Sequence, residues 1–333
     1  MTLQRPVAGR TRPATGAPPK RWGDRLFRRG TGLSAVLVIV LLLATAVFLL
    51  GESWAALTHY GPGSFLSSQR WAPSEAVSDS ATPNPYGILQ FVYGTLVTSV
   101  IAMVIAVPVS VAVALFITEI APARLRRSMG YLVDLLAAIP SVVYGFWGIF
   151  ALVPAIKPIG QFVTETLGKA PVIGPVFAGP FFGVSYFTAG LVLAIMILPI
   201  ITAICREVFL VAPIEEKEAA IGLGATRFEM LRMAVLPRSR SGIVGASILG
   251  LGRAFGETIA VTMLIGNSVL QISTSIFAQG ATMPSVIANE FTEANQPFHI
   301  ESLFVVATWL LVLSLIANLI GKRIVSRTSM DIA

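Results

Sequence analysis

SGIVGASILGLGRAFGETIAVTMLI, residues 241–265, is an apolar segment that contains one arginine and one glutamate. It is long enough to cross a bilayer, whose hydrocarbon core takes about 20 apolar residues in a helix. Arg253 lies near the middle of the segment, and an arginine cannot avoid the cost of burial by losing its proton. It must therefore face protein or water, and Glu257, one helical turn later, is expected within reach as its partner. The pair predicts either a static lock between helices or a gate for an anion.

The rest of the chain has the composition of a membrane protein. Of its 333 residues, 55% are hydrophobic and 12% are charged, whereas soluble domains carry about 25% charged residues. Long uncharged runs predict six membrane-spanning helices, at 33–50, 86–118, 135–156, 184–204, 241–265 and 302–321. We therefore predict an all-α, multi-pass protein of the cell (plasma or inner) membrane.

The distribution of basic residues predicts the orientation of the chain. Twenty of the 24 lysines and arginines lie in the segments 1–30, 120–129, 205–240 and 321–333. These segments alternate with the others along the chain, so the positive-inside rule places them, with both termini, in the cytoplasm. The net charge of +7 is thus a feature of topology, and no nucleic-acid partner is expected.

Three regions are expected along the chain. Residues 1–32 are rich in Pro, Gly, Arg and Thr and should form a disordered basic tail. Residues 33–321 should form the six-span domain, and residues 322–333 a short cytoplasmic tail. Cys205 is the only cysteine, which excludes an intrachain disulfide, and no metal site is expected.

The inner loop CREVFLVAPIEEKEAAIGLGATRFEMLRMAVLPRSR, residues 205–240, predicts two short helices. Pro213 suits the first turn of one helix, which two glycines follow. Thr226 and Glu229 have the spacing of a capping box and should start a second helix, which is expected to end at Pro237. From these features alone, an amphipathic loop on the membrane surface and a docking element for a cytoplasmic partner are equally good interpretations.

The same loop resembles the EAA loop of ABC-importer permeases. The matching residues are Glu218, Ala219, Ala220, Gly224, Leu236 and Pro237. Ala234 stands where that family often has isoleucine. The resemblance implies the type I ABC-importer permease fold, in which this loop seats in a cleft of a cytoplasmic ATPase subunit and passes nucleotide-driven closure to the membrane helices.

A longer stretch, residues 218–267, resembles the signature region of phosphate (Pst) type permeases. Residues 85–122 and 137–154 resemble the PstC-like subunits of that type, so the resemblance covers most of the chain from about residue 85. It implies that Arg253 and Glu257 line or gate the phosphate path. Weaker pathway candidates are Ser141, Tyr144 and Thr258. Serine and threonine hydroxyls often donate only to a carbonyl of their own helix, so a structural role is the simpler interpretation of such residues.

The resemblance implies the transmembrane permease subunit of an ATP-driven inorganic phosphate importer, and not an enzyme. The chain has no GxxxxGK[ST] motif, so a separate chain must hydrolyse ATP with Mg²⁺, and no cofactor is expected on this one. The implied partners are a PstA-like sister permease, two copies of a PstB-like ATPase, an extracytoplasmic PstS-like phosphate-binding protein and the lipid bilayer.

Other functions are consistent with parts of the sequence. Permeases for sulfate or molybdate resemble this chain around R-A-x-G-E, and a secondary anion transporter would need no ATPase. A membrane enzyme is disfavoured because the spans hold one candidate charged pair and no set of catalytic or metal-binding groups. Phosphate is favoured over sulfate because it keeps a hydroxyl proton near pH 7, from which a carboxylate such as Glu257 can accept a hydrogen bond.

Overall fold

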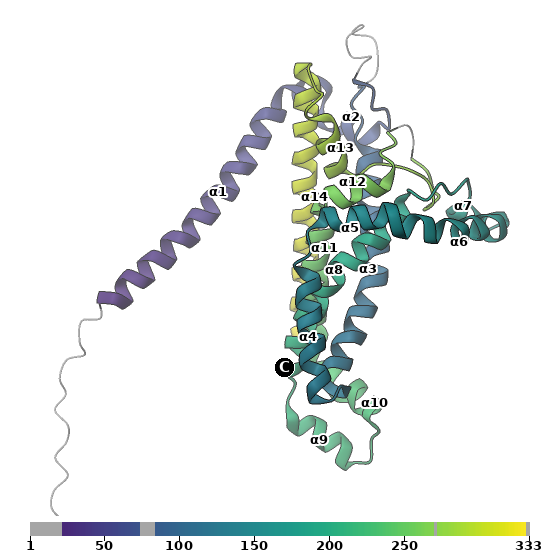
Figure 1. The fold of residues 1–333 in the computed structure, drawn as a ribbon. Helices are drawn as coiled ribbons and strands as arrows, with labels where there is room; N and C mark the ends of the chain where they lie inside the picture. The colour runs from purple at the N-terminus through teal and green to yellow at the C-terminus, as the bar shows by residue number, and fades with distance from the viewer. Residues whose placement is uncertain (1–21, 74–83, 270–271, 331–333) are drawn as a thin grey trace, which may run out of the picture. The chain divides into compact units, whose positions relative to one another are not determined.

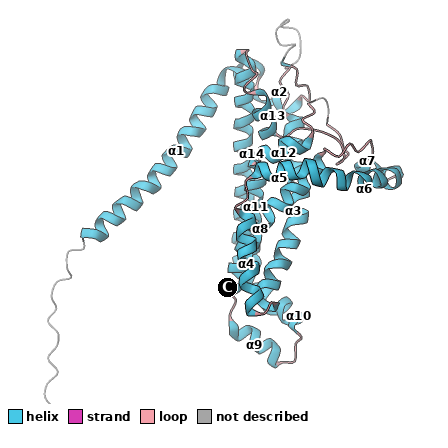
Figure 2. Ribbon diagram, in the orientation of Figure 1, coloured by secondary structure: helices cyan, strands magenta, loops and turns pink. Residues whose placement is uncertain are grey.

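The computed structural model describes residues 22–73, 84–269 and 272–330. Within these residues the structure is helical, and it has two isolated β-bridges but no strand (Figure 2). The elements in chain order are α1 (Trp22–Tyr60), α2 (Pro62–Ser67), α3 (Leu89–Leu115), η2 (Phe116–Ile120), α4 (Ala123–Ala137), α5 (Ser141–Trp147), η3 (Gly148–Leu152), α6 (Val153–Thr166), η4 (Leu167–Lys169), α7 (Gly174–Phe177), α8 (Tyr186–Leu210), α9 (Ile214–Gly222), α10 (Arg227–Met230), η5 (Leu231–Val235), α11 (Leu236–Gly256), α12 (Ile259–Ile265), α13 (Met283–Glu290) and α14 (Pro297–Met330). The prediction of an all-α protein is confirmed.

The chain forms two compact units, residues 1–47 and 48–333, and α1 crosses from one into the other. The described part of the first unit is a single helix whose apolar side chains are exposed. Such a helix suits contact with lipid or with another membrane protein. α1 begins at Trp22, so residues 22–32 are helical rather than disordered, while residues 1–21 lie outside the described part. α14 likewise continues beyond residue 321, to Met330.

Five helical segments of the described chain are long and apolar enough to cross a membrane. They are Arg25–Tyr60, Leu89–Ile120, Ser141–Lys169, Tyr186–Leu210 and Pro297–Arg327. α11 and α12 form a sixth only when they are counted as one crossing, because they meet at a bend of 65°. With that pair counted once, the structure agrees with the six predicted spans.

The boundaries predicted for the third span, 135–156, are wrong. α4 ends at Ala137 and α5 begins at Ser141, with Pro140 between them in an extended conformation (ψ 140°). Proline disfavours helical geometry in the preceding residue and has no N–H to donate, so one helix cannot run through this point. The apolar run continues in α5 and α6, which lie across the direction of the long helices in Figure 1.

α8 is the central helix of the second unit. In its most apolar 18-residue window 61% of the residues are buried, against 28% or less in the other four long apolar helices. It packs on α3, α4, α11 and α12. Gly190 permits the close approach to α3, because a Cβ there would lie 2.7 Å from Ile101 Cγ2. On α3, Ser110 donates a 3.0 Å hydrogen bond to the Leu198 carbonyl of α8.

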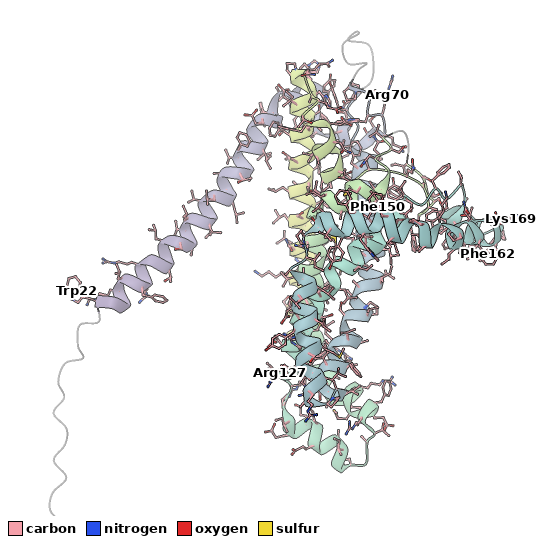
Figure 3. All side chains as sticks on the ribbon, viewed as in Figure 1. Trp22, Arg70, Arg127, Phe150, Phe162 and Lys169 are labelled. Atoms are coloured by element: carbon pink, nitrogen blue, oxygen red, sulfur yellow. The ribbon has the colours of Figure 1, made fainter. Side chains whose placement is uncertain are left out.

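The two ends of the second unit carry different loops. α9 and α10 lie at one end, toward which Arg127 of α4 also points, whereas α2, α13 and Arg70 lie at the opposite end (Figures 1 and 3). The segments 120–129 and 205–240, which the charge pattern assigns to one side of the membrane, therefore share one end. We call the end with α9 and α10 the coupling end.

α9 begins after Pro213, as predicted, and ends in a Schellman motif. The Gly224 N–H donates to the Ile221 carbonyl at 2.9 Å, and the Ala225 N–H donates to the Ala220 carbonyl at 3.1 Å. Gly224 has φ 89°, in the left-handed region. No atom lies within 4 Å of a Cβ built there, so the position needs glycine for its backbone conformation and not for space.

Thr226 and Glu229 form the predicted capping box at the start of α10. The Glu229 N–H donates to Thr226 Oγ1 at 3.3 Å, and the Thr226 N–H donates to Glu229 Oε2 at 2.8 Å. The backbone hydrogen bond from Thr226 holds the pKa of the Glu229 carboxyl below its ordinary value. The two bonds fix the corner between α9 and α10.

The second helix does not end at Pro237, as predicted, but continues into α11. The preceding turn, η5, is π-helical, and the Leu236 N–H reaches back five residues to the Leu231 carbonyl. Proline in an α-helix clashes with the carbonyl four residues earlier and lacks an N–H. The wider π turn places Pro237 at the first positions of a new α-helical stretch, where both effects are tolerated.

Gly224→Ala is expected to loosen the end of α9, because a left-handed alanine costs about 1–2 kcal/mol, and the Ala225 amide should exchange with deuterium roughly 5- to 30-fold faster. Gly222→Ala is the matched control. Gly222 also has open space beside it, but it lies within α9, so alanine there should slow the same exchange. Equal exchange in the two variants would show that the Schellman motif does not hold this loop.

Candidate functional site

The apolar segment around Arg253 contains a break in the helix. α11 ends at Gly256, α12 begins at Ile259, and the two meet at 65°. Glu257, between them, has an extended backbone with ψ 121°. The prediction of one continuous helix through this segment is therefore wrong at residues 257 and 258.

The break separates the two charges. Arg253 lies in the last turn of α11 with its side chain exposed, whereas Glu257 is buried. Glu257 Oε1 accepts a long hydrogen bond of 3.4 Å from the Ala260 N–H, in the first turn of α12. In the described part of the chain, no hydrogen bond or ion pair joins the two side chains. A contact between residues four apart needs a continuous helix, and α11 ends before Glu257.

The ends of the two helices provide favourable electrostatic surroundings for the charges of Arg253 and Glu257. The free carbonyls at the C-terminus of α11 carry partial negative charge and favour the Arg253 guanidinium, and the free N–H groups at the start of α12 favour the Glu257 carboxylate. Each such interaction stabilises by about 0.3–1 kcal/mol near a surface, and by more where the site is partly buried. Helix dipoles, and not mutual contact, therefore place this pair.

α5 lies against α12 next to the break. A Cβ on Gly145 would stand 2.6 Å from the Met263 Sδ, so glycine permits this packing. The adjacent Tyr144 is buried, and its hydroxyl donates a 2.9 Å hydrogen bond to the Leu136 carbonyl in the last turn of α4. Tyr144 thus joins α5 to the end of α4.

Ser141 and Thr258, the remaining pathway candidates, occupy helix starts. Ser141 is the first residue of α5 and is half-buried. Thr258 precedes α12, and its Oγ1 donates to the Gly256 carbonyl at 3.3 Å, which partly satisfies an acceptor that the break leaves free. The structure therefore places three of the five candidates, Arg253, Glu257 and Thr258, at the break. Tyr144 and Ser141 lie one turn apart on α5, which packs against α12.

Asn267 caps the C-terminus of α12, a role that was not predicted from the sequence. Its φ of 49° is left-handed, and it follows Gly266, whose φ is 91°. The side-chain Nδ2 donates to the Thr262 carbonyl at 2.7 Å, which satisfies one of the acceptors at the end of the helix. The Gly-Asn dipeptide is the available signal, because these two residues tolerate left-handed backbone best.

Three ion pairs join helices at the coupling end. They are Lys217–Glu119 at 2.6 Å, Arg238–Glu216 at 2.7 Å and Arg206–Asp134 at 3.7 Å. The side-chain hydrogen bond from Arg238 holds the pKa of the Glu216 carboxyl below its ordinary value. Sequence spacing could not reveal these pairs, since Lys217 and Glu119 are 98 residues apart and belong to different helices.

The residues of the predicted EAA motif lie in the same loop, and three of the six are exposed. Glu218, Ala219 and Gly224 are exposed, and Ala220, Leu236 and Pro237 are half-buried. Beside them Leu223 is 90% exposed and Phe228 is 71% exposed, whereas Leu231 and Val235 turn into the core. A cluster of exposed large apolar side chains marks a surface for contact with another protein or a membrane.

Comparison with known proteins places the chain in a family. Residues 106–330 match the family model described as a binding-protein-dependent transport system inner membrane component. The chain is 43% identical over 300 residues to the phosphate transport system permease protein PstC of Haemophilus influenzae, covering 88% of this chain and 92% of that one. It is 42% identical over 305 residues to the PstC protein of Mesorhizobium japonicum, covering 91% and 90%.

A solved structure shares the fold. An inward-facing form of the MetNI methionine ABC transporter matches with a TM-score of 0.50 at 20% identity, over 73% of this chain and 94% of that one. The family match contains α4 through α14, and hence the break, the coupling loop and all the candidate site residues. The chain belongs to the family of binding-protein-dependent transport system inner membrane components, among the relatives of the PstC permeases, and is a multi-pass transport subunit of the inner membrane.

Proposed function

We propose that the chain is the permease subunit of an ATP-driven importer of inorganic phosphate. The relatives at 42–43% identity are phosphate transport permeases by name. The observation that carries the proposal is the Arg253 side chain, which is exposed at a helix break inside an apolar segment. Such a charge must face water or protein inside the bilayer, so this side of α11 faces the path and the sister permease that completes it.

The chemistry of Arg253 suits an oxyanion. A guanidinium presents several N–H donors in a planar fork that matches two oxygens of a phosphate group. Among the described residues no acceptor side chain occupies this fork, so an incoming anion does not have to displace one. Arg253 therefore provides the attraction that draws the anion to the break.

Glu257 discriminates among anions. It is buried next to the break, and its carboxylate has acceptor capacity beyond the bond from Ala260. A carboxylate repels an anion without protons but accepts a hydrogen bond from a protonated one. Phosphate keeps a hydroxyl proton near pH 7 and sulfate does not, so Glu257 favours phosphate.

The chain operates with three kinds of partner. A PstA-like sister permease covers exposed apolar surface such as that of η3 and α6, from which Phe150 and Phe162 project (Figure 3). Two copies of a PstB-like ATPase supply ATP hydrolysis with Mg²⁺, one of them seated on α9 and α10 at the coupling end. A PstS-like phosphate-binding protein delivers its ligand at the opposite end. This chain itself binds no cofactor, and both of its termini are cytoplasmic.

The groove beside α9 suits the ATPase contact. It has a volume of about 580 Å³ and is lined by the end of α8, the start of α11 and the loop between α8 and α9, which contributes Val211 and Pro213. With the exposed Leu223 and Phe228 it offers apolar surface next to charges at the coupling end. Closure of the ATPase would move α9 and through it the helices that meet at the break, which gives alternating access.

In cells that lack this chain, uptake of labelled phosphate at low concentration should be lost, while sulfate uptake continues. Wild-type protein should restore uptake, and Arg253→Ala at equal expression should lower it at least tenfold, because each charge-assisted hydrogen bond contributes about 1.5–3 kcal/mol. Because the Arg253 side chain is exposed, we expect the variant to reach the membrane in normal amounts.

Labelled sulfate, run in parallel, is the control for substrate. Loss of sulfate uptake with phosphate uptake intact would indicate that the chain belongs to a permease for another oxyanion, such as sulfate. Phosphate uptake that survives ATP depletion, with the membrane potential clamped, would instead indicate a secondary transporter.

Glu257→Gln should narrow the preference for phosphate over sulfate in transport by the permease. Glutamine keeps an acceptor oxygen for the Ala260 N–H, so α12 should start as in the wild type, but the repulsion of unprotonated anions is lost. The measurement is competition between the two anions in proteoliposomes, with Thr262→Val as a matched control outside the break. An unchanged preference would assign selectivity to the binding protein alone.

A further inference from the structure

One ion pair at the coupling end joins α9 to a helix outside the EAA motif. Lys217 Nζ lies 2.6 Å from Glu119 Oε1, and Glu119 belongs to the π-helical turn η2 that ends α3. The side chains are only 17% and 12% exposed. The adjacent ion pair, Arg238–Glu216, is three times as open, at 45% and 36%. Arg238 makes two hydrogen bonds to Glu216, but solvent screens that open pair much more, so the attraction between Lys217 and Glu119 is the less screened of the two.

Three consecutive charges give α9 its orientation. Glu216 binds Arg238 at the start of α11, Lys217 binds Glu119 at the end of α3, and Glu218 is exposed. Successive residues on a helix point about 100° apart. α9 is therefore held on two sides by two different membrane helices, and its third side is left for a partner.

Both attachments are made next to π-helical turns. Glu119 lies within η2, and Arg238 follows η5 by three residues. π turns occur in short pieces, are less regular than α-helix and are common at functional sites. A force applied through either ion pair thus reaches a membrane helix at a point where its hydrogen-bond pattern already changes.

We propose that the Lys217–Glu119 ion pair is the link that transmits movement of α9 to α3, so that Glu119 and Lys217 are positioning residues for coupled transport. This rests on the proposed function of α9 as the ATPase docking element. α3 packs on α8 and on α11, which carries Arg253 in its last turn. The Arg238–Glu216 pair alone would move only α11. The Lys217–Glu119 pair also moves α3, and with it the core of the unit.

The test uses the complete importer, with sister permease, ATPase and binding protein, in proteoliposomes. Phosphate transported and ATP hydrolysed are measured together, with and without phosphate-loaded binding protein. Glu119→Gln and Lys217→Gln should each lower the stimulation of ATP hydrolysis by the loaded binding protein and the phosphate moved per ATP, by about 2- to 30-fold. Binding of the ATPase should stay normal, because the exposed face of α9 is unchanged.

The exchange Glu119→Lys with Lys217→Glu rebuilds the pair and should restore most of the stimulation. Glu216→Gln, in the more open pair beside it, is the matched control and should have the smaller effect. Wild-type stimulation in both single variants, or no recovery in the exchanged variant, would overturn the proposal. Loss of assembly in both single variants would overturn it as well, because the pair would then serve only the fold. If the wild-type importer itself moves no phosphate with ATP, the proposed function fails instead.

Discussion

The constraint on which the structure depends is that backbone hydrogen-bonding groups must be satisfied in a bilayer. The chain interrupts a helix at residues 257 and 258, inside an apolar segment, and thereby frees carbonyls on α11 and N–H groups on α12. Side chains next to the break meet that demand: Thr258 donates to a carbonyl and Glu257 accepts from an amide. Arg253 adds its charge to the carbonyl end. Polar side chains beside the bend therefore satisfy some of the backbone groups that the bend leaves free.

The same demand explains the packing around the break. α12 has only seven residues and cannot stand alone as a helix. α5 and α8 enclose it, and the absence of side chains at Gly145 of α5 and Gly148 of η3 lets both elements approach it closely. Asn267 then closes the far end of α12. The short helix beyond the break is thus packed on two sides, capped by Asn267 at its far end and hydrogen-bonded to Glu257 in its first turn.

Much of the fold could be predicted from the sequence, because apolar length, charge distribution and helix signals are local. The Thr226–Glu229 capping box and the glycine at the end of α9 follow from a few adjacent residues. For the site, the sequence predicted which residues belong to it but not the helix break that separates Arg253 from Glu257. The break after Gly256 carries no proline, and a helix with an Arg–Glu pair four residues apart is locally just as reasonable. Packing against α5 and α8 favours the broken helix over the continuous one, and this packing cannot be predicted from the spacing of residues in the sequence. Pro237 shows the opposite error: a strong local stop signal is overcome by the π turn before it.

The ion pairs at the coupling end show that a short sequence motif does not include all the residues that hold its helix in place. The EAA residues mark the surface that faces outward, and they say nothing of what holds α9 from behind. Lys217 and Glu216, next to the motif, carry that support through partners on α3 and α11. A docking helix anchored to one membrane helix could swing about its attachment. Anchored to two helices that also pack on each other, it is more constrained. The shielded pair to Glu119 therefore makes displacement of α9 a displacement of the helices around the Arg253 break.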